Sequence, residues 1–231
     1  MTEPESKSQP PVIKRFSLLH RRSQMERTRF LEHYENIHGP LAAGQEGFRQ
    51  FTYRYHQNHV QAGFAAGLEP PYDGISVTYQ KPRADYRDGF FGHPDYANVR
   101  ADEAFLFDLD ATVSVLAREQ IVCERDGAAA KAIFLVADSE SEAMDDIIVD
   151  PPAVVRKAVR NSLDGESASA LGIGEATSPW REIWEVWFAS DADRERGCRD
   201  RTTLATLGGS LLSPTTVALA VRELVVFSED E

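Results

Sequence analysis

The sequence predicts an α+β protein in which two ferredoxin-like βαββαβ units lie in one chain and pack sheet to sheet as a pseudo-twofold barrel. The same order of strand-like and helix-like segments occurs twice in 231 residues, at a period of roughly 115, which indicates an internal duplication. The strand-like segments are also apolar on both faces, as Phe16 and Leu18 against Ile13 and Leu19 illustrate. Neither face of such a sheet can remain in water, so the two sheets are expected to bury each other.

The first unit is expected over residues 12–125, after a polar, Pro/Ser-rich tail at residues 1–11 that we expect to be disordered. A helix is predicted to start at Ser23, in a capping box with Glu26, and to end at Gly39-Pro40. A second helix is predicted over residues 95–108 from its apolar spacing. Alternating apolar residues predict the strands of this unit, at residues 12–19, 49–60, 75–80 and 112–123.

The second unit is expected over residues 131–228, after a hinge at residues 126–130. Its segments repeat the order of the first unit without obvious identity between the copies. Strands are predicted at residues 131–137, 161–173, 181–188 and 215–227, and helices at residues 139–159 and 191–207.

Composition excludes several classes of function. The net charge of −12 argues against a nucleic-acid partner and against an anionic membrane surface. No apolar run approaches the ~20 residues that span a bilayer. The two cysteines, Cys123 and Cys198, form neither a disulfide framework nor a metal-knuckle spacing. We therefore expect a cytoplasmic protein with no membrane or nucleic-acid partner.

The segment FLEHYENIHGPL, residues 30–41, is the strongest candidate for chemistry. Phe30, Tyr34 and His38 are spaced i, i+4, i+8, so they share one face of a helix, and the imidazole comes last, next to the backbone break. Histidine titrates near neutrality, which suits a general base or acid. All six histidines lie in the first 93 residues, so we expect the site in the first half, between its sheet and its helices.

Further candidates come from the strands and loops of the same half. His59 is a second candidate catalytic residue, on the predicted face of Tyr53 and Tyr55, whereas His56 points to the opposite face and His33 is expected to be solvated. Tyr34 could donate a hydrogen bond to a developing oxyanion. The remaining substrate-binding candidates are Phe30, Phe51, Tyr53, Tyr55, Asp73, Tyr79 and His93.

No metal or cofactor is expected. The sequence has no H-x-H, HExxH or facial-triad pattern, and Gly172-Ile-Gly174 is too short for a dinucleotide fingerprint.

The first half resembles the EthD family of the dimeric α/β-barrel superfamily. The resemblance lies in residues 13–19, the HGPL element at residues 38–41, the N-H-V at residues 58–60, the D-G-I at residues 73–75, and residues 94–107. It covers about 110 residues, and the second half looks like a diverged copy that lacks HGPL and histidine. The resemblance implies small tailoring enzymes that act on aromatic or polyketide-like molecules, many of them without a cofactor.

Three functions follow from these observations. The first is a lyase or isomerase of the dehydratase or decarboxylase type, with His38 as acid or base on a small aromatic or cyclic substrate. The alternatives are an oxidoreductase, namely a cofactor-free monooxygenase of a phenolic substrate, and a non-catalytic module that binds a hydrophobic small molecule. The sequence chooses neither the substrate nor the oligomeric state, and a homodimer of the duplicated chain is left open.

Overall fold

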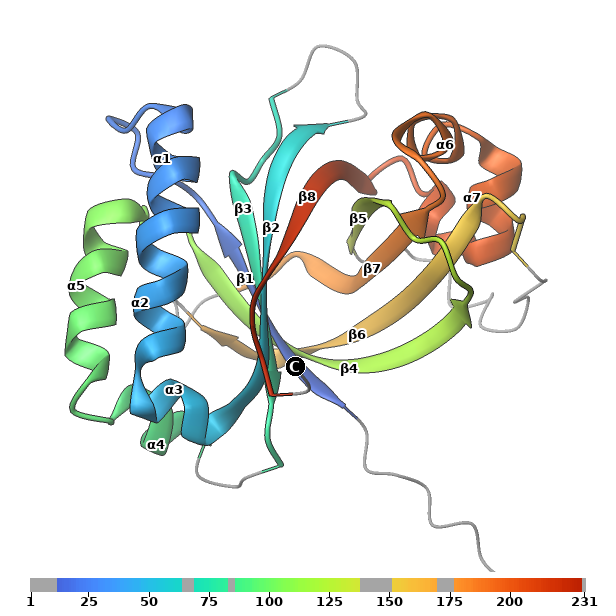
Figure 1. Cartoon of the computed structure of the whole chain (residues 1–231). Helices are drawn as coiled ribbons and strands as arrows, with labels where there is room; N and C mark the ends of the chain where they lie inside the picture. The colour runs from blue at the N-terminus through green and yellow to red at the C-terminus, as the bar shows by residue number, and fades with distance from the viewer. Residues whose placement is uncertain (1–11, 64–68, 83–85, 138–150, 170–176, 230–231) are drawn as a thin grey trace, which may run out of the picture.

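The computed structural model describes residues 12–63, 69–82, 86–137, 151–169 and 177–229 (Figure 1). Its strands and helices confirm the predicted α+β class. The strands are β1 Ile13–Leu19, β2 Thr52–Gly63, β3 Gly74–Gln80, β4 Val113–Glu124, β5 Ala130–Ala137, β6 Val155–Ser169, β7 Trp180–Phe188 and β8 Val217–Ser228. The helices are α1 Arg27–His33, the π-helix η1 Tyr34–His38, α2 Gly39–Gly44, α3 Glu46–Phe51, α4 Tyr86–Phe91, α5 Tyr96–Leu106, α6 Asp191–Gly197, α7 Arg201–Leu207 and the 3₁₀-helix η2 Gly209–Leu212.

The eight strands form one closed antiparallel barrel in the order β1-β3-β2-β8-β5-β7-β6-β4. Within the barrel, β4-β1-β3-β2 and β8-β5-β7-β6 have the same internal order, fourth-first-third-second, in the two halves of the chain. The sheets are not merely stacked, as the sequence suggested. Their edges are hydrogen-bonded to each other through β2·β8 and β4·β6, which leaves no free edge.

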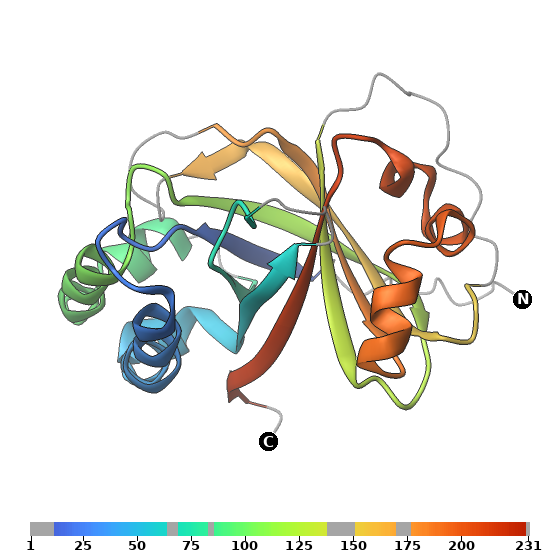
Figure 2. The same ribbon diagram turned by 90° about the horizontal axis from the view of Figure 1, so that it is seen from above.

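The helices coat the outside of the barrel in two separate layers (Figures 1 and 2). Helices α1, α2 and α5 cover the sheet of the first half, with α3 and α4 at one end of that layer. Helices α6 and α7 cover the sheet of the second half. Each sheet therefore has one face toward the barrel interior and one toward its own helices.

The first helical segment differs from the prediction at both ends. It begins at Arg27, and no side chain caps it, so the capping box of Ser23 with Glu26 is wrong. Gly39-Pro40 does not end it: Gly39 is right-handed, and α2 continues with Pro40 in its first turn. The π-helical turn explains the tolerance of Pro40, because the local i→i+5 pattern relieves the clash that proline causes in an α-helix.

Gly39 is required for close packing rather than for a turn. A Cβ at this position would lie 2.8 Å from Nε2 of Gln57, a buried side chain whose Nε2 makes two hydrogen bonds. We expect Gly39→Ala to lower the free energy of unfolding by about 1–3 kcal/mol, the usual cost of overpacking. Gly44→Ala is the matched control in the same helix, because a Cβ there meets nothing within 4 Å. Denaturant unfolding of both variants checks the difference, and equal stabilities would contradict this account.

The second strand starts later than predicted and changes face. Residues 46–51 form α3, so Phe51 ends a helix, and β2 begins at Thr52. Between Thr52 and Arg54 the register with β3 shifts by one residue, which is a β-bulge at Tyr53. Tyr53 consequently packs in the barrel interior, while Tyr55 packs under the helices. The prediction that these two tyrosines share one face is therefore wrong.

The second half also departs from the predicted elements. Residues 155–159 belong to β6, not to a helix, and the rest of the predicted helix at residues 139–159 falls mostly on residues 138–150, outside the described residues. The predicted strand at residues 161–173 is the later part of β6 as far as Ser169. The predicted helix at residues 191–207 is two helices, α6 and α7, because Asp200 caps a new start with hydrogen bonds from Thr202 and Thr203.

The barrel interior has an apolar part and an ionic part. The apolar part contains Phe16 and Leu18 from the first half and Ile133 and Leu135 from the second. Alternate positions on the same strands continue with charged groups: Lys14 and Lys131 contact the fully buried Glu185 at 2.5 and 2.7 Å. Further carboxylates complete this ionic cluster, Glu119 on Lys14 and Glu223 on Lys131.

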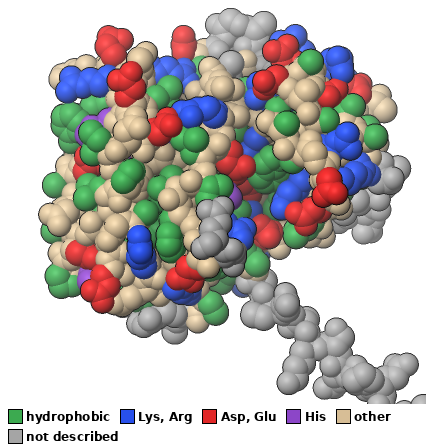
Figure 3. Space-filling model, in the orientation of Figure 1, with side chains coloured by type: hydrophobic (Ala, Val, Ile, Leu, Met, Phe, Trp, Pro, Cys, Tyr) green, Lys and Arg blue, Asp and Glu red, His purple; other side chains and the backbone are tan. Residues whose placement is uncertain are grey.

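None of the helices in the described ranges is long and apolar enough to cross a membrane. On the face seen in Figure 3, acidic and basic side chains are intermingled over both halves.

Candidate active site

A pocket lies between the sheet of the first half and its helices, and its floor is made of small hydroxyl side chains. Ser17 of β1 pairs in register with Ser76 of β3 and with Ser114 of β4, which places three serines in one row across the sheet. The Ser17 and Ser114 hydroxyls are 2.6 Å apart. Because serine is small, this row leaves empty space where larger side chains would fill the gap between sheet and helices.

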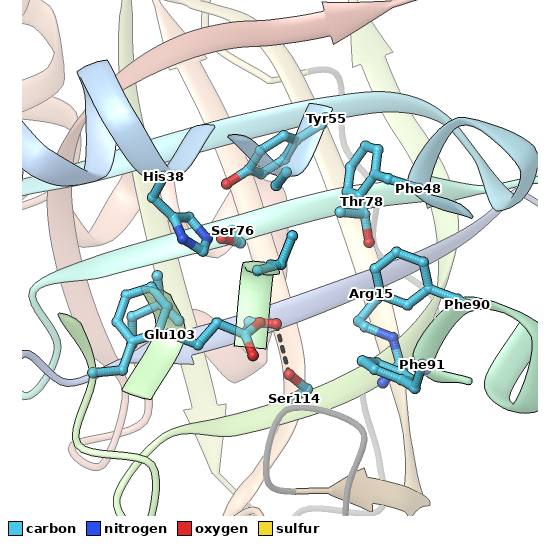
Figure 4. A pocket seen from close by; sticks show the side chains of 15 residues that line it. Arg15, His38, Phe48, Tyr55, Ser76, Thr78, Phe90, Phe91, Glu103 and Ser114 are labelled. Atoms are coloured by element: carbon cyan, nitrogen blue, oxygen red, sulfur yellow. Dashed lines mark hydrogen bonds between the residues drawn. The ribbon is translucent and has the colours of Figure 1, made fainter. Parts of the chain in front are cut away.

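Aromatic side chains from the helix layer form the wall of the pocket. Phe48 of α3 and Phe90 and Phe91 of α4 gather at one end (Figure 4). Phe107, after α5, also lines the pocket, and its ring centroid lies 5.2 Å from that of His38. Arg15 of β1 and Thr78 of β3 are on the same side as Phe90 and Phe91. The empty space is about 540 Å³ with its mouth included. An apolar wall with a few hydroxyls is the usual make-up of a small-molecule site.

His38 enters the pocket from η1 at the end opposite Phe90 and Phe91 (Figure 4). Its Nδ1 lies 2.8 Å from Oδ2 of Asp102 on α5. Nε2 has no hydrogen-bond partner among the described residues. In this arrangement the carboxylate holds the Nδ1 proton and fixes the ring, and Nε2 carries the lone pair that a general base needs.

Asp102 is shared by a second histidine. His33 Nε2 lies 2.6 Å from the other carboxylate oxygen, Oδ1, so the expectation that His33 is solvated is wrong. In an α-helix, five residues advance one full turn and about 140° more, which would separate the two rings. The π-helical turn between them brings both onto the side of α5. Burial would raise the pKa of Asp102, but hydrogen bonds from His38 and His33 outweigh it and lower this pKa.

Glu103 is a second carboxyl group in the pocket, next to Asp102 on α5. It is buried, and the Tyr96 hydroxyl donates to its Oε2 at 2.7 Å. Burial raises the pKa of Glu103 against the opposing effect of His38 and Arg100. An imidazole and a carboxyl group that holds its proton more tightly than usual therefore face the same space, a combination suited to moving protons on a bound ligand.

Of the three candidate catalytic residues, the structure places only His38 on the pocket wall. Tyr34 is fully buried behind the wall, and its hydroxyl lies 2.6 Å from the Ser76 hydroxyl. His59 is buried behind Tyr34, with the two rings 5.2 Å apart. Tyr55, predicted to bind substrate, does line the pocket.

The other predicted binding residues lie elsewhere. Phe30 stacks on Tyr34, away from the pocket, and Phe51 is buried beneath Gly89 of α4. Tyr53 and Tyr79 contact each other inside the barrel, with their rings 5.8 Å apart. The last two lie outside the pocket: Asp73 pairs with Arg21 at 2.6 Å, and His93 Nδ1 is within hydrogen-bonding distance of Asp95, at 2.5 Å.

Sequence reasoning missed Asp102, Glu103 and the three serines. Glu103 carried a signal, because Tyr96, Val99, Glu103 and Leu106 form the buried stripe of α5 and one member of that stripe is charged. The serines carried a weaker one, since each interrupts an apolar strand of the first half. Asp102 is one residue outside the stripe, and its role depends on the π-helical turn opposite it.

The corresponding region of the second half holds large apolar side chains. Phe134, Trp184 and Phe188 of its sheet pack against Leu204 and Leu207 of α7. A hollow beside this cluster is lined by Phe134 and Leu204 themselves, by further apolar residues, and by Arg199 and Arg201. Within the described ranges, no group of three or more His, Cys, Asp or Glu side chains is placed to hold a metal ion. The His33–Asp102–His38 contacts are hydrogen bonds, as their 2.6 and 2.8 Å separations require.

The structure is an α+β barrel with a pocket between the sheet and the helices of its first half. Residues 22–110 match the family model of the EthD domain. This match lies within the first half of the chain and agrees with the resemblance to the EthD family that its sequence indicated. The sequence matches no curated protein.

Some solved structures are similar to this chain at low sequence identity. An anthrone oxidase-like protein is 11% identical, with a TM-score of 0.54 and coverage of 94% of both chains. Two further proteins are provisionally named as monooxygenases, and each is 7% identical. The one from Lactobacillus acidophilus NCFM has a TM-score of 0.47 and covers 93% of this chain and 94% of its own. The one from Fusobacterium nucleatum subsp. nucleatum ATCC 25586 has a TM-score of 0.48 and covers 94% of this chain and 92% of its own. At these identities the likeness concerns the fold alone.

Proposed function

We propose that this chain is a cofactor-independent monooxygenase of an aromatic or cyclic substrate with an acidic C–H bond. The observation that carries the proposal is His38, whose ring Asp102 holds by Nδ1 while Nε2 is left for a ligand inside an aromatic-walled pocket. The name of the anthrone oxidase-like protein, whose TM-score exceeds 0.5, supports this oxidoreductase alternative. Nothing comparable supports the lyase or isomerase that the sequence alone favoured.

The proposed reaction converts a CH₂ group between aryl rings into a ketone. His38 Nε2 removes one proton, and the electron pair spreads onto the ring carbonyl, whose oxygen the hydroxyls of Tyr55 and Ser76 can stabilise. The carbanion then forms a C–O bond with O₂ and, after protonation, a hydroperoxide. Loss of the second C–H proton breaks the O–O bond, giving C=O and water. The substrate supplies all four electrons, and Glu103 can carry the proton that the departing oxygen takes up.

We further infer that the chain is an internally duplicated dimeric α/β-barrel of two ferredoxin-like units, of which only the first has a site. The identical strand order of the two halves supports the duplication. The row of serines in the first half, and the large apolar side chains that take its place in the second, support the division of roles.

Oxygen uptake tests the proposed activity. With an anthrone as substrate, the purified protein is expected to consume one O₂ per quinone formed, above the rate in buffer, and ¹⁸O₂ should place one label in the product. Turnover under argon with loss of water or CO₂ would instead indicate the lyase. Saturable binding of the anthrone without turnover would indicate the binding module.

A further inference from the structure

A line of hydrogen bonds runs from the surface of the second half to the pocket of the first. It starts at Arg222 of β8, whose guanidinium Nη2 lies 3.1 Å from Nδ1 of His59 on β2. His59 Nε2 lies 3.1 Å from Oε1 of Gln57, and Gln57 Nε2 lies 3.1 Å from the Tyr55 hydroxyl in the pocket wall. Apart from Arg222, every member is almost completely buried, so water does not compete for these bonds.

The direction of every bond in this line is fixed from the Arg222 end. A guanidinium group only donates, so the Nδ1 of His59 must accept, and the ring proton must be on Nε2. Nε2–H then donates to the Gln57 carbonyl, which turns the amide nitrogen toward Tyr55. Burial, together with Arg222, lowers the pKa of His59 to about 4, so the ring is neutral at pH 7. A neutral ring carries one proton, which here is on Nε2.

A second hydrogen bond of the Gln57 amide nitrogen fixes the same direction independently. Its Nε2 also lies 2.7 Å from the backbone carbonyl oxygen of Tyr34, which can only accept. The amide nitrogen therefore belongs on this side, as the Arg222 end also requires. Because the Tyr55 hydroxyl accepts from Gln57, its own proton is left to be donated to Ser76, to Tyr34 or to a ligand in the pocket.

We propose that Arg222 is a positioning residue that, through His59 and Gln57, holds the Tyr55 hydroxyl as a hydrogen-bond donor toward the pocket. The second half then contributes to the site across the β2·β8 seam and is more than a barrel partner. His59 acts here by orienting its neighbours and does not touch the ligand. The consequence for turnover rests on the proposed function; the direction of the hydrogen bonds does not.

The test is the tautomer of His59, read by long-range ¹H–¹⁵N correlation in ¹⁵N-histidine-labelled protein at pH 7 and assigned with a His59→Gln variant. The wild type is expected to show the Nε2–H tautomer. Arg222 is exposed, so Arg222→Leu should be tolerated by the fold. In this variant His59 should show a mixture of both tautomers, and its pKa should rise. Arg222→Lys keeps a group that only donates and should restore the Nε2–H tautomer and the lowered pKa. Glu35→Gln is the control for the tautomer: Glu35 pairs with the same guanidinium, and its Oε2 lies 3.9 Å from His59 Nδ1 and raises the pKa of His59. This variant should keep the Nε2–H tautomer and lower the pKa of His59, the opposite direction to Arg222→Leu.

An Nδ1–H tautomer in the wild type, or an unchanged tautomer in Arg222→Leu, would overturn the proposal. Oxidation of an anthrone should fall roughly tenfold in Arg222→Leu, as is common when the support of a reacting group is removed, and recover in Arg222→Lys. If the tautomer responds as expected but the wild type oxidises no anthrone, the positioning role stands and the proposed function fails.

Discussion

Replacing His38 with alanine is expected to lower anthrone oxidation by 10²-fold or more, because a positioned general base contributes about 10²–10⁴-fold to proton transfer. The affinity for the quinone product should change little, since the aromatic wall of Phe48, Phe90 and Phe91 that binds the rings is untouched. The measurement is kcat from oxygen uptake together with the Kd of the quinone from fluorescence titration. A loss confined to affinity would mean that His38 binds and does not catalyse.

His33→Ala is the matched control for this variant. His33 contacts the same carboxylate of Asp102 from the same helical segment, but it does not line the pocket. We expect a much smaller fall in kcat than for His38→Ala, because Asp102 still holds His38. Equal losses in the two variants would contradict the assignment of His38 as the base and would point to the integrity of the Asp102 contacts instead.

Much of the frame of this site could be predicted from sequence. The segment at residues 30–41 predicted that His38 faces a pocket, and the histidine distribution predicted that this pocket lies in the first half. Strand periodicity was sufficient for the barrel because each strand has one face toward the interior and one toward helices. These features depend on local spacing, which a single sequence displays directly.

The details that complete the site depend on irregular backbone. Gly39-Pro40 is a common helix end, and nothing local distinguishes it from the first turn of a continuing helix after a π-helical turn. The bulge turns the side chain of Tyr53 into the barrel interior, whereas Tyr55 stays on the face of β2 under the helices. Such one-residue shifts depend on packing between segments that are distant in the sequence, so they are not readable from either segment alone.

Replacing Glu185 with alanine is expected to lower the free energy of unfolding by about 3–5 kcal/mol, because it leaves two buried ammonium groups without their shared carboxylate. Lys14 comes from the first half of the chain and Lys131 from the second, so Glu185 joins the two halves inside the barrel. Urea unfolding measures the loss. Glu124→Ala is the matched control: its pair with Lys157 also links neighbouring strands but is exposed, and such pairs contribute about 0–1 kcal/mol.

The same carboxylate makes stability depend on pH in a defined window. Burial would raise the pKa of Glu185, but Lys131 and Lys14 outweigh it and lower this pKa from 4.5 to about 2. A carboxyl group whose pKa is lower in the folded state stabilises the fold above its unfolded pKa. That contribution, about 3 kcal/mol for such a shift, is therefore present above pH 4.5 and is lost as the pH falls toward 2. Unfolding curves between pH 7 and pH 2 should show wild type and Glu185→Ala converging; a constant difference would rule out this ionic cluster as the cause.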